Sequence, residues 1–270
     1  MNKLKRLLRP LGIALAAVVT VITLGFVDRS TAGAPITDLH VQVEGGEGVH
    51  FIDEGAVRRA ILDQGTAVVG AASGQVDLAG IEARLRAIPC VAGAEVYHDL
   101  GGALHVRVRQ RQPVIRVLNG DGTSFYIDEE GWTMPVDGDY TARVPVAMGW
   151  LNEPGAANGV IQVHGHDTLV QRYRSDDLHR LALFLRDDPL WKALIDQVVV
   201  TADGAFELIP IVGGQRILLG GADALEQRFA KLRLFYANGI PKADWRRYAR
   251  IDLRFNDQIV CTKRTNPYEQ

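Results

Sequence analysis

An uncharged apolar run near the N-terminus constrains this chain more than any other feature. It covers residues 11–27 and lies between a basic segment, residues 1–10, and the pair Asp28-Arg29. A run of about 17 residues is at the short end of what a helix needs to cross a bilayer. The sequence therefore predicts a transmembrane helix over residues 11–27, preceded by a short tail, residues 1–10.

The charges around this run predict its orientation. Four basic residues and no acidic ones precede it: Lys3, Lys5, Arg6 and Arg9. Basic residues stay on the cytoplasmic side of a membrane. We therefore expect a single-pass protein of the cell inner membrane with a cytoplasmic N-terminus and the bulk of the chain in the periplasm, or more generally outside the cytoplasm.

A cleaved signal peptide is the alternative, because Ala32-Gly33-Ala34 has the small-x-small form of a cleavage site. The apolar run is longer than a usual signal-peptide core, and this site lies several residues beyond its end. These two features favour a retained anchor. Both alternatives place the rest of the chain outside the cytoplasm.

The composition predicts a folded chain of ordinary character. Hydrophobic residues make up 47% of it and charged residues 23%, far from the signature of disorder. The net charge of -2 gives no reason to expect a nucleic-acid partner. Cys90 and Cys261 are too few for a disulfide framework or a zinc site, which leaves two buried thiols or a single bridge between them.

Residues 36–112, which follow a linker at residues 28–35, have the pattern of a small α+β domain. A strand with alternating apolar residues comes first, and two amphipathic helices follow it, with Asp53 and Asp77 in position to cap them. Residues 91–97 and 104–109 then flank the turn Asp99-Leu100-Gly101-Gly102, which is typical of a hairpin. The predicted order is β-α-α-β-β.

Residues 113–261 predict a second, strand-rich domain, before a flexible polar tail at residues 262–270. Ser175 is placed to cap one helix, and a second helix begins near Leu225. Strands are expected at residues 114–118, 125–128, 198–201, 206–211 and 215–219.

The chain shows no signature of an active site. Phosphate-binding loops, nucleophile elbows and metalloprotease motifs are missing from the sequence. His164 and His166 would supply half of a metal site, but no third ligand suggests itself, and two exposed polar histidines are favoured. We therefore predict a protein that is not an enzyme and has no cofactor, metal or small-molecule substrate.

The segment from Ile251 to Phe255 reads as the last strand. Ile251, Leu253 and Phe255 share one face, and Asp252 and Arg254 share the other. A terminal strand often lies at a sheet edge, where a partner's extended segment can add to it. These five residues are the predicted partner-binding edge, although the spacing equally allows Phe255 to be a core residue.

Four segments carry a resemblance to a known family. They are Ile88-Pro89-Cys90-Val91, Arg109-Gln110-Arg111-Gln112-Pro113-Val114, Phe125-Tyr126-Ile127-Asp128-Glu129-Glu130-Gly131-Trp132 and Ile251-Asp252-Leu253-Arg254-Phe255. The first, which leads into Ala94-Glu95-Val96-Tyr97 and Leu104-His105-Val106-Arg107-Val108, resembles a POTRA domain together with the β-α-α-β-β order. The second is similar to the exit from the POTRA domain in FtsQ/DivIB cell-division proteins, and the last two are similar to segments of the β domain that follows it. A single anchor and a single POTRA domain fit that family.

The resemblance implies an α+β fold, with a POTRA domain and then a mixed or antiparallel β domain with covering helices. It also implies a divisome scaffold that binds FtsB and FtsL and supports septum formation, with Arg254 and Phe255 as contact residues. The alternative is a POTRA-bearing chaperone or secretion component. Such proteins usually carry several POTRA domains or a barrel, and this sequence has neither internal repeats nor alternating barrel strands.

Overall fold

The computed structural model describes residues 33–46, 48–63, 68–153, 155–164, 174–239 and 247–264. The chain divides into two compact units, the first extending to Gln110 and the second beginning at Arg111, while Gly46–Phe51 belongs to the second. The predicted transmembrane helix, residues 11–27, lies outside the described residues. Within the described ranges, no helix has the length and apolar character needed to span a membrane.

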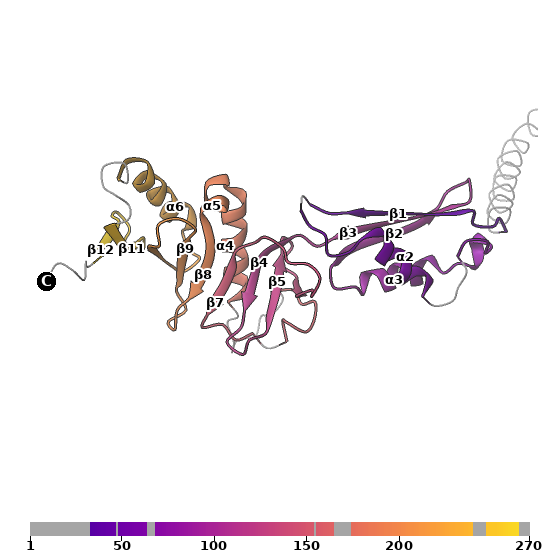
Figure 1. Ribbon diagram of the computed structural model, residues 1–270, viewed down its shortest axis with the longest axis horizontal. Helices are drawn as coiled ribbons and strands as arrows, with labels where there is room; N and C mark the ends of the chain where they lie inside the picture. Colours follow the sequence, from indigo (N-terminus) through magenta and orange to yellow (C-terminus); the bar gives the residue numbers. More distant parts are fainter. Residues whose placement is uncertain are drawn as a thin grey trace, which may run out of the picture. The chain divides into compact units, whose positions relative to one another are not determined.

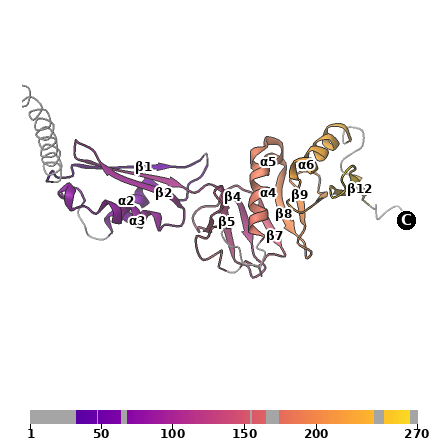
Figure 2. The same ribbon diagram turned by 180° about the vertical axis from the view of Figure 1, so that it is seen from behind.

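The first unit has the predicted β-α-α-β-β order (Figure 1). Its elements are β1 (Asp38–Glu44), α2 (Glu54–Leu62), α3 (Leu78–Arg86), β2 (Val91–His98) and β3 (Ala103–Gln110), with a 3-10 turn, η1 (Ser73–Gln75), between the helices. The sheet order is β1-β3-β2, with β1 parallel and β2 antiparallel to β3. Both helices lie on the same side of this sheet (Figures 1 and 2).

Local chemistry explains why these helices begin where they do. The carboxylate of Asp53 accepts a hydrogen bond from the Ala56 amide at 2.6 Å, and that of Asp77 accepts one from the Gly80 amide at 2.9 Å. Each satisfies an amide that has no partner inside its helix. The buried side chains of Leu104, Val106 and Val108 alternate along β3, and the helices cover this apolar face.

The second unit is built on a large mixed sheet. In the described part of the chain it has nine strands in the order β12-β11-β10-β9-β8-β7-β4-β5-β6. The bounds are β4 (Pro113–Leu118), β5 (Ser124–Asp128), β6 (Thr133–Pro135), β7 (Val146–Gly149), β8 (Ile195–Val200), β9 (Phe206–Pro210), β10 (Arg216–Gly220), β11 (Tyr248–Asp252) and β12 (Val260–Lys263). The β4-β7, β7-β8 and β10-β11 pairs are parallel.

Helices α4 (Ser175–Asp187), α5 (Pro189–Leu194) and α6 (Leu225–Leu234) pack on this sheet, and α6 continues into a π-helical turn, η2 (Phe235–Gly239). Alternate strand residues point into the core, as Phe206 and Leu208 do on β9. Trp191 and Phe229 meet edge to face, with ring centroids 5.0 Å apart.

Three expectations from the sequence need correction. Ser175 does not cap α4 but begins it, and the buried carboxylate of Glu153 accepts from the Ser175 amide at 2.8 Å instead. The last strand of the sheet runs past Cys261, to Lys263, so residues 262 and 263 are not part of a loose tail. Residues 251–255 are not the sheet edge, because β12 pairs with β11 on its outer side.

Candidate partner-binding surface

The five residues predicted from the sequence divide between the core and the surface. Ile251 and Leu253 are 1% and 0% exposed and belong to the core of the second unit. Asp252 is partly buried, whereas Arg254 and Phe255 are exposed just after β11 ends. Only the last two therefore present their side chains to a partner.

The open edge of the sheet is β12. Within the described residues it pairs on one side only, antiparallel to β11, with Ile251 opposite Cys261 and Asp252 opposite Val260. The Arg264 amide donates to the Arg247 carbonyl, so it faces inward. Because inward and outward amides alternate along such a strand, those of Cys261 and Lys263 face outward.

The turn after β11 is held by ionic contacts. The Arg254 guanidinium donates to Asp252, with Nη2 2.6 Å from Oδ2 and Nε 3.0 Å from Oδ1. These hydrogen bonds hold the pKa of Asp252 below its usual value. Lys231 of α6 donates to the carbonyls of Leu253 and Phe255. Arg254 and Phe255 are thus carried on an ordered turn beside the edge strand.

A row of arginines crosses the strands next to β12. Arg216 on β10 lies directly opposite Arg250 on β11. Together with Arg264 and two small residues, Gly214 and Ala249, they line a shallow depression of about 520 Å³. Glu207 pairs with Arg216 at 3.0 Å, but among the described residues Arg250 has no ion-pair partner. Like charges directly opposite one another destabilise a sheet, so this row is ready to accept an anion.

Apolar side chains flank the same row. Ile211 and Val212, in the turn between β9 and β10, are 64% and 50% exposed. The next residue, Gly213, accepts a hydrogen bond from the Arg264 guanidinium at 2.8 Å, which ties this turn to the end of β12. Phe255 and Val260 are also more than a third exposed. The surface therefore combines main-chain groups, positive charge and apolar contact area.

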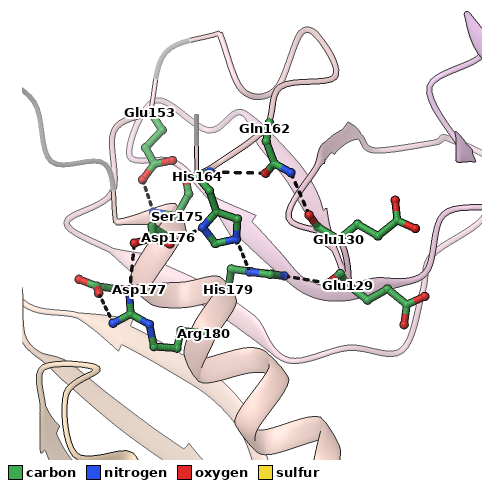
Figure 3. A network of polar contacts seen from close by, with 10 residues as sticks. All are labelled: Glu129, Glu130, Glu153, Gln162, His164, Ser175, Asp176, Asp177, His179 and Arg180. Atoms are coloured by element: carbon green, nitrogen blue, oxygen red, sulfur yellow. Dashed lines mark hydrogen bonds and ion pairs between the residues drawn. The ribbon is translucent and has the colours of Figure 1, made fainter. Parts of the chain in front are cut away.

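A second cluster of functional groups lies near the opposite end of the sheet, where His164 meets α4 (Figure 3). His164 Nδ1 is 2.6 Å from Asp176 Oδ1, and His164 Nε2 is 3.0 Å from His179 Nδ1. His179 Nε2 is 3.2 Å from the Glu129 carbonyl oxygen. Burial lowers the pKa of His179. These contacts form one continuous chain from a carboxylate to a backbone carbonyl.

Among the described residues no group of three or more histidine, cysteine or acidic side chains has an arrangement that could hold a metal ion. His166, which the sequence pairs with His164, lies outside the described residues. His164 instead bonds to Asp176 and His179, which are far from it in sequence.

Comparison with known proteins gives the family. The profile described as "FtsQ/DivIB, C-terminal related" matches residues 112–262, and one described as "POTRA-like domain" matches residues 36–109. The chain belongs to the FtsQ/DivIB family. The Cell division protein FtsQ of Rhodothermus marinus is 29% identical over 231 residues, which cover 83% of this chain and 77% of that relative. This chain is therefore a cell-division protein of the FtsQ/DivIB type.

Sequence reasoning about this FtsQ/DivIB chain found the right part of the sheet but not its outermost strand. The four residues of β12, Val-Cys-Thr-Lys, are too few and too polar for a clear alternating pattern. Nor did the sequence indicate that Arg216 and Arg250 are neighbours, because parallel pairing of β10 with β11 joins residues far apart in the chain. A basic residue in each of two separate strands was the only available signal.

Proposed function

We propose that this FtsQ/DivIB protein is a membrane-anchored scaffold of the bacterial divisome, which links FtsB and FtsL to the division site and supports septum formation. Residues 11–27 serve as its anchor, and both described units lie outside the cytoplasm. The first, POTRA-like unit contacts other divisome proteins, and the sheet of the second unit captures a segment of FtsB, itself associated with FtsL.

The observation that carries this proposal is the open strand β12. Its outward main-chain groups, at Cys261 and Lys263, offer a partner strand the hydrogen bonds of one more ladder. Arg254 and Phe255 lie beside it and supply side-chain contacts. We expect the main chain to supply affinity and the neighbouring side chains to supply specificity.

The arginine row adds the chemical character of the partner. Arg216 and Arg250 lie opposite one another, and Glu207 compensates only the charge of Arg216, so a carboxylate of the partner could pair with Arg250. Exposed Ile211 and Val212 suit an apolar residue of the same segment. The bound segment is therefore expected to be extended and to carry acidic and apolar side chains.

Two substitutions of one residue test the main-chain part of this proposal. Lys263→Pro removes an outward amide, whereas Lys263→Ala removes the same charge and keeps the amide. Proline is tolerated at an edge position whose amide faces solvent, so both variants should melt like the wild type. Binding of full-length protein to the extracytoplasmic segment of FtsB from the same organism is measured by biolayer interferometry.

We expect Lys263→Pro to bind at least about tenfold more weakly than Lys263→Ala, the effect of one lost hydrogen bond with an unsatisfied carbonyl. Equal affinities of the two variants would exclude strand addition at β12. A variant with Arg254→Glu and Phe255→Ala tests the side chains in the same assay. No binding by the wild type would contradict the FtsB part of the proposal altogether.

A further inference from the structure

The hydrogen-bond chain of Figure 3 permits only one arrangement of protons. A carbonyl oxygen only accepts, so His179 Nε2 carries a proton and donates it to Glu129. His179 is neutral near pH 7, since burial lowers its pKa, and its Nδ1 is therefore an acceptor. His164 Nε2 must then carry a proton and donate it to His179 Nδ1.

The other end of the chain requires one more proton. His164 Nδ1 lies 2.6 Å from a carboxylate oxygen of Asp176, and two lone pairs cannot face one another at that distance. A proton lies between them, and it stays on nitrogen because a carboxyl group is a stronger acid than an imidazolium. The three contacts together therefore require three ring protons on the two imidazoles.

The segment that ends at His164 covers the edge strand β6. The Thr133 amide donates to the Ile161 carbonyl and the Val163 amide to the Gly131 carbonyl, both at 2.8 Å. Trp132 and Gln162 form an antiparallel bridge. Gly131 has no side chain, which leaves space for the His164 ring; a Cβ there would lie 2.9 Å from Nε2. Residues 161–163 thus occupy the position of a further strand.

We propose that the His164–His179 pair is a proton-dependent latch, which holds residues 161–163 over β6 and closes this edge of the sheet only while the pair carries three ring protons. A fourth proton, on His179 Nδ1, places two N–H groups against each other. Loss of the third ring proton leaves a lone pair of a His164 ring nitrogen facing either Asp176 or His179. In both cases one hydrogen bond between Asp176, His164 and His179 breaks. The segment beside β6, which we call the cover, is then held by backbone contacts alone.

The other charged groups around the latch have hydrogen-bond or ion-pair partners of their own. On α4, Asp176 also accepts from Arg180 at 3.2 Å, and Asp177 accepts from Arg174 at 3.4 Å.

On the β5–β6 turn, the Glu129 carboxylate pairs with Arg186 at 3.1 Å and buried Asp128 with Arg111 at 2.8 Å. The Glu130 carbonyl accepts from Gln162 of the cover at 3.0 Å, and Glu153 is engaged by the Ser175 amide.

The first test reads the protons directly. The ¹⁵N shifts of the imidazole nitrogens are measured at pH 7 in the full-length protein with ¹⁵N-labelled histidine. We expect both nitrogens of His164, and only Nε2 of His179, to be protonated. In Asp176→Asn the amide donates to Nδ1, so His164 should lose its charge while the link persists. A neutral His164 in the wild type would overturn the proposal.

The second test measures how firmly the cover is held on β6. Amide exchange of Thr133 and Val163, corrected for intrinsic rates, is compared at pH 7 and pH 5. Protection should fall about tenfold at pH 5 in the wild type, the effect of one lost charge-assisted link. It should fall much less in His179→Gln, which cannot gain a proton. His105→Gln, which alters another His–Asp pair, is the control and should behave like the wild type.

Equal protection of Thr133 and Val163 at both pH values in the wild type would overturn the latch. So would the same decrease in His179→Gln as in the wild type. Amides of Val198 and Leu208, in the centre of the sheet, report whether the whole unit has opened. A decrease of their protection equal to that of Val163 would assign the change to global unfolding and contradict a local latch.

Discussion

Arg216 and Arg250 are direct cross-strand neighbours on the parallel strands β10 and β11. Glu207 neutralises the first, whereas the second has no ion-pair partner among the described residues. A sheet selected for stability alone would not keep two arginines opposite one another. In the proposed complex, an acidic side chain of the bound segment would pair with Arg250.

Replacing Arg250 should therefore change stability and binding in opposite directions. Arg250→Thr is expected to raise the free energy of unfolding by about 0.5 kcal/mol, because it removes like-charge repulsion and places a β-branched residue in a strand. It should weaken binding of the FtsB segment. Urea denaturation and interferometry measure the two effects. Arg143→Thr, an exposed arginine in the loop before β7, is the control, and a variant that loses both stability and affinity would contradict this account.

Glu153 should make the stability of the second unit depend on pH. Burial raises its pKa, although the amides of Ser175 and Arg174 oppose this. The folded state therefore holds the proton more tightly than the unfolded chain, and this contribution to stability is lost as pH rises through the raised pKa. Glu153→Gln, whose amide oxygen still accepts from Ser175, should gain stability relative to the wild type between pH 4 and pH 7. Urea titrations at both pH values measure this difference, and Glu226→Gln, an exposed acid on α6, should show no such trend.

Gly149 should tolerate no side chain. Its φ is +106°, and a Cβ would lie 2.3 Å from the Val200 carbonyl oxygen on β8. Gly149→Ala is expected to cost at least about 2 kcal/mol through backbone strain and displacement of β8. Gly138→Ala, where nothing lies within 4 Å, should stay within about 0.5 kcal/mol of the wild type in the same thermal or urea unfolding measurement. Comparable losses in the two variants would refute this assignment.

Asp128 should be a main stabilising residue of the β5–β6 turn. Its buried carboxylate accepts from Arg111 at 2.8 Å and from the Trp132 amide at 2.7 Å. Asp128→Ala removes the counter-charge of a buried arginine and is expected to cost about 3 kcal/mol. Asp121→Ala, in an exposed turn, should have a much smaller effect on stability in the same unfolding experiment. A similar loss of unfolding free energy in the two variants would show that burial of the carboxylate does not determine its contribution to stability.

The sequence predicted what depends on nearby residues. The capping roles of Asp53 and Asp77 and the hairpin at Asp99 rest on contacts within a few residues, and the structure confirms them. The cap at Ser175 was wrong because a buried carboxylate 22 residues earlier, Glu153, takes its place. Tertiary packing brings the Glu153 carboxylate to the Ser175 amide, and a local sequence pattern gives no information about such packing.

In the candidate sites too, features set by nearby residues were predicted from the sequence, and features set by long-range packing were not. Alternation correctly placed Ile251 and Leu253 on one buried face, but the edge depends on which strand pairs outside β11. The link between His164 and His179 likewise requires α4 to pack beside β4 and β5. Both are long-range pairings of short or polar segments, for which hydrophobic periodicity carries little information.

The position of β12 in the chain has a consequence for biosynthesis. The open edge is made by residues 260–263, later in the sequence than every other strand described, and β11 must dock on β10 before β12 has anything to pair with. Because chains are made from the N-terminus and fold as they emerge, the proposed partner-binding surface forms last. A partner that adds a strand to β12 would therefore bind only chains in which the rest of this sheet has already folded.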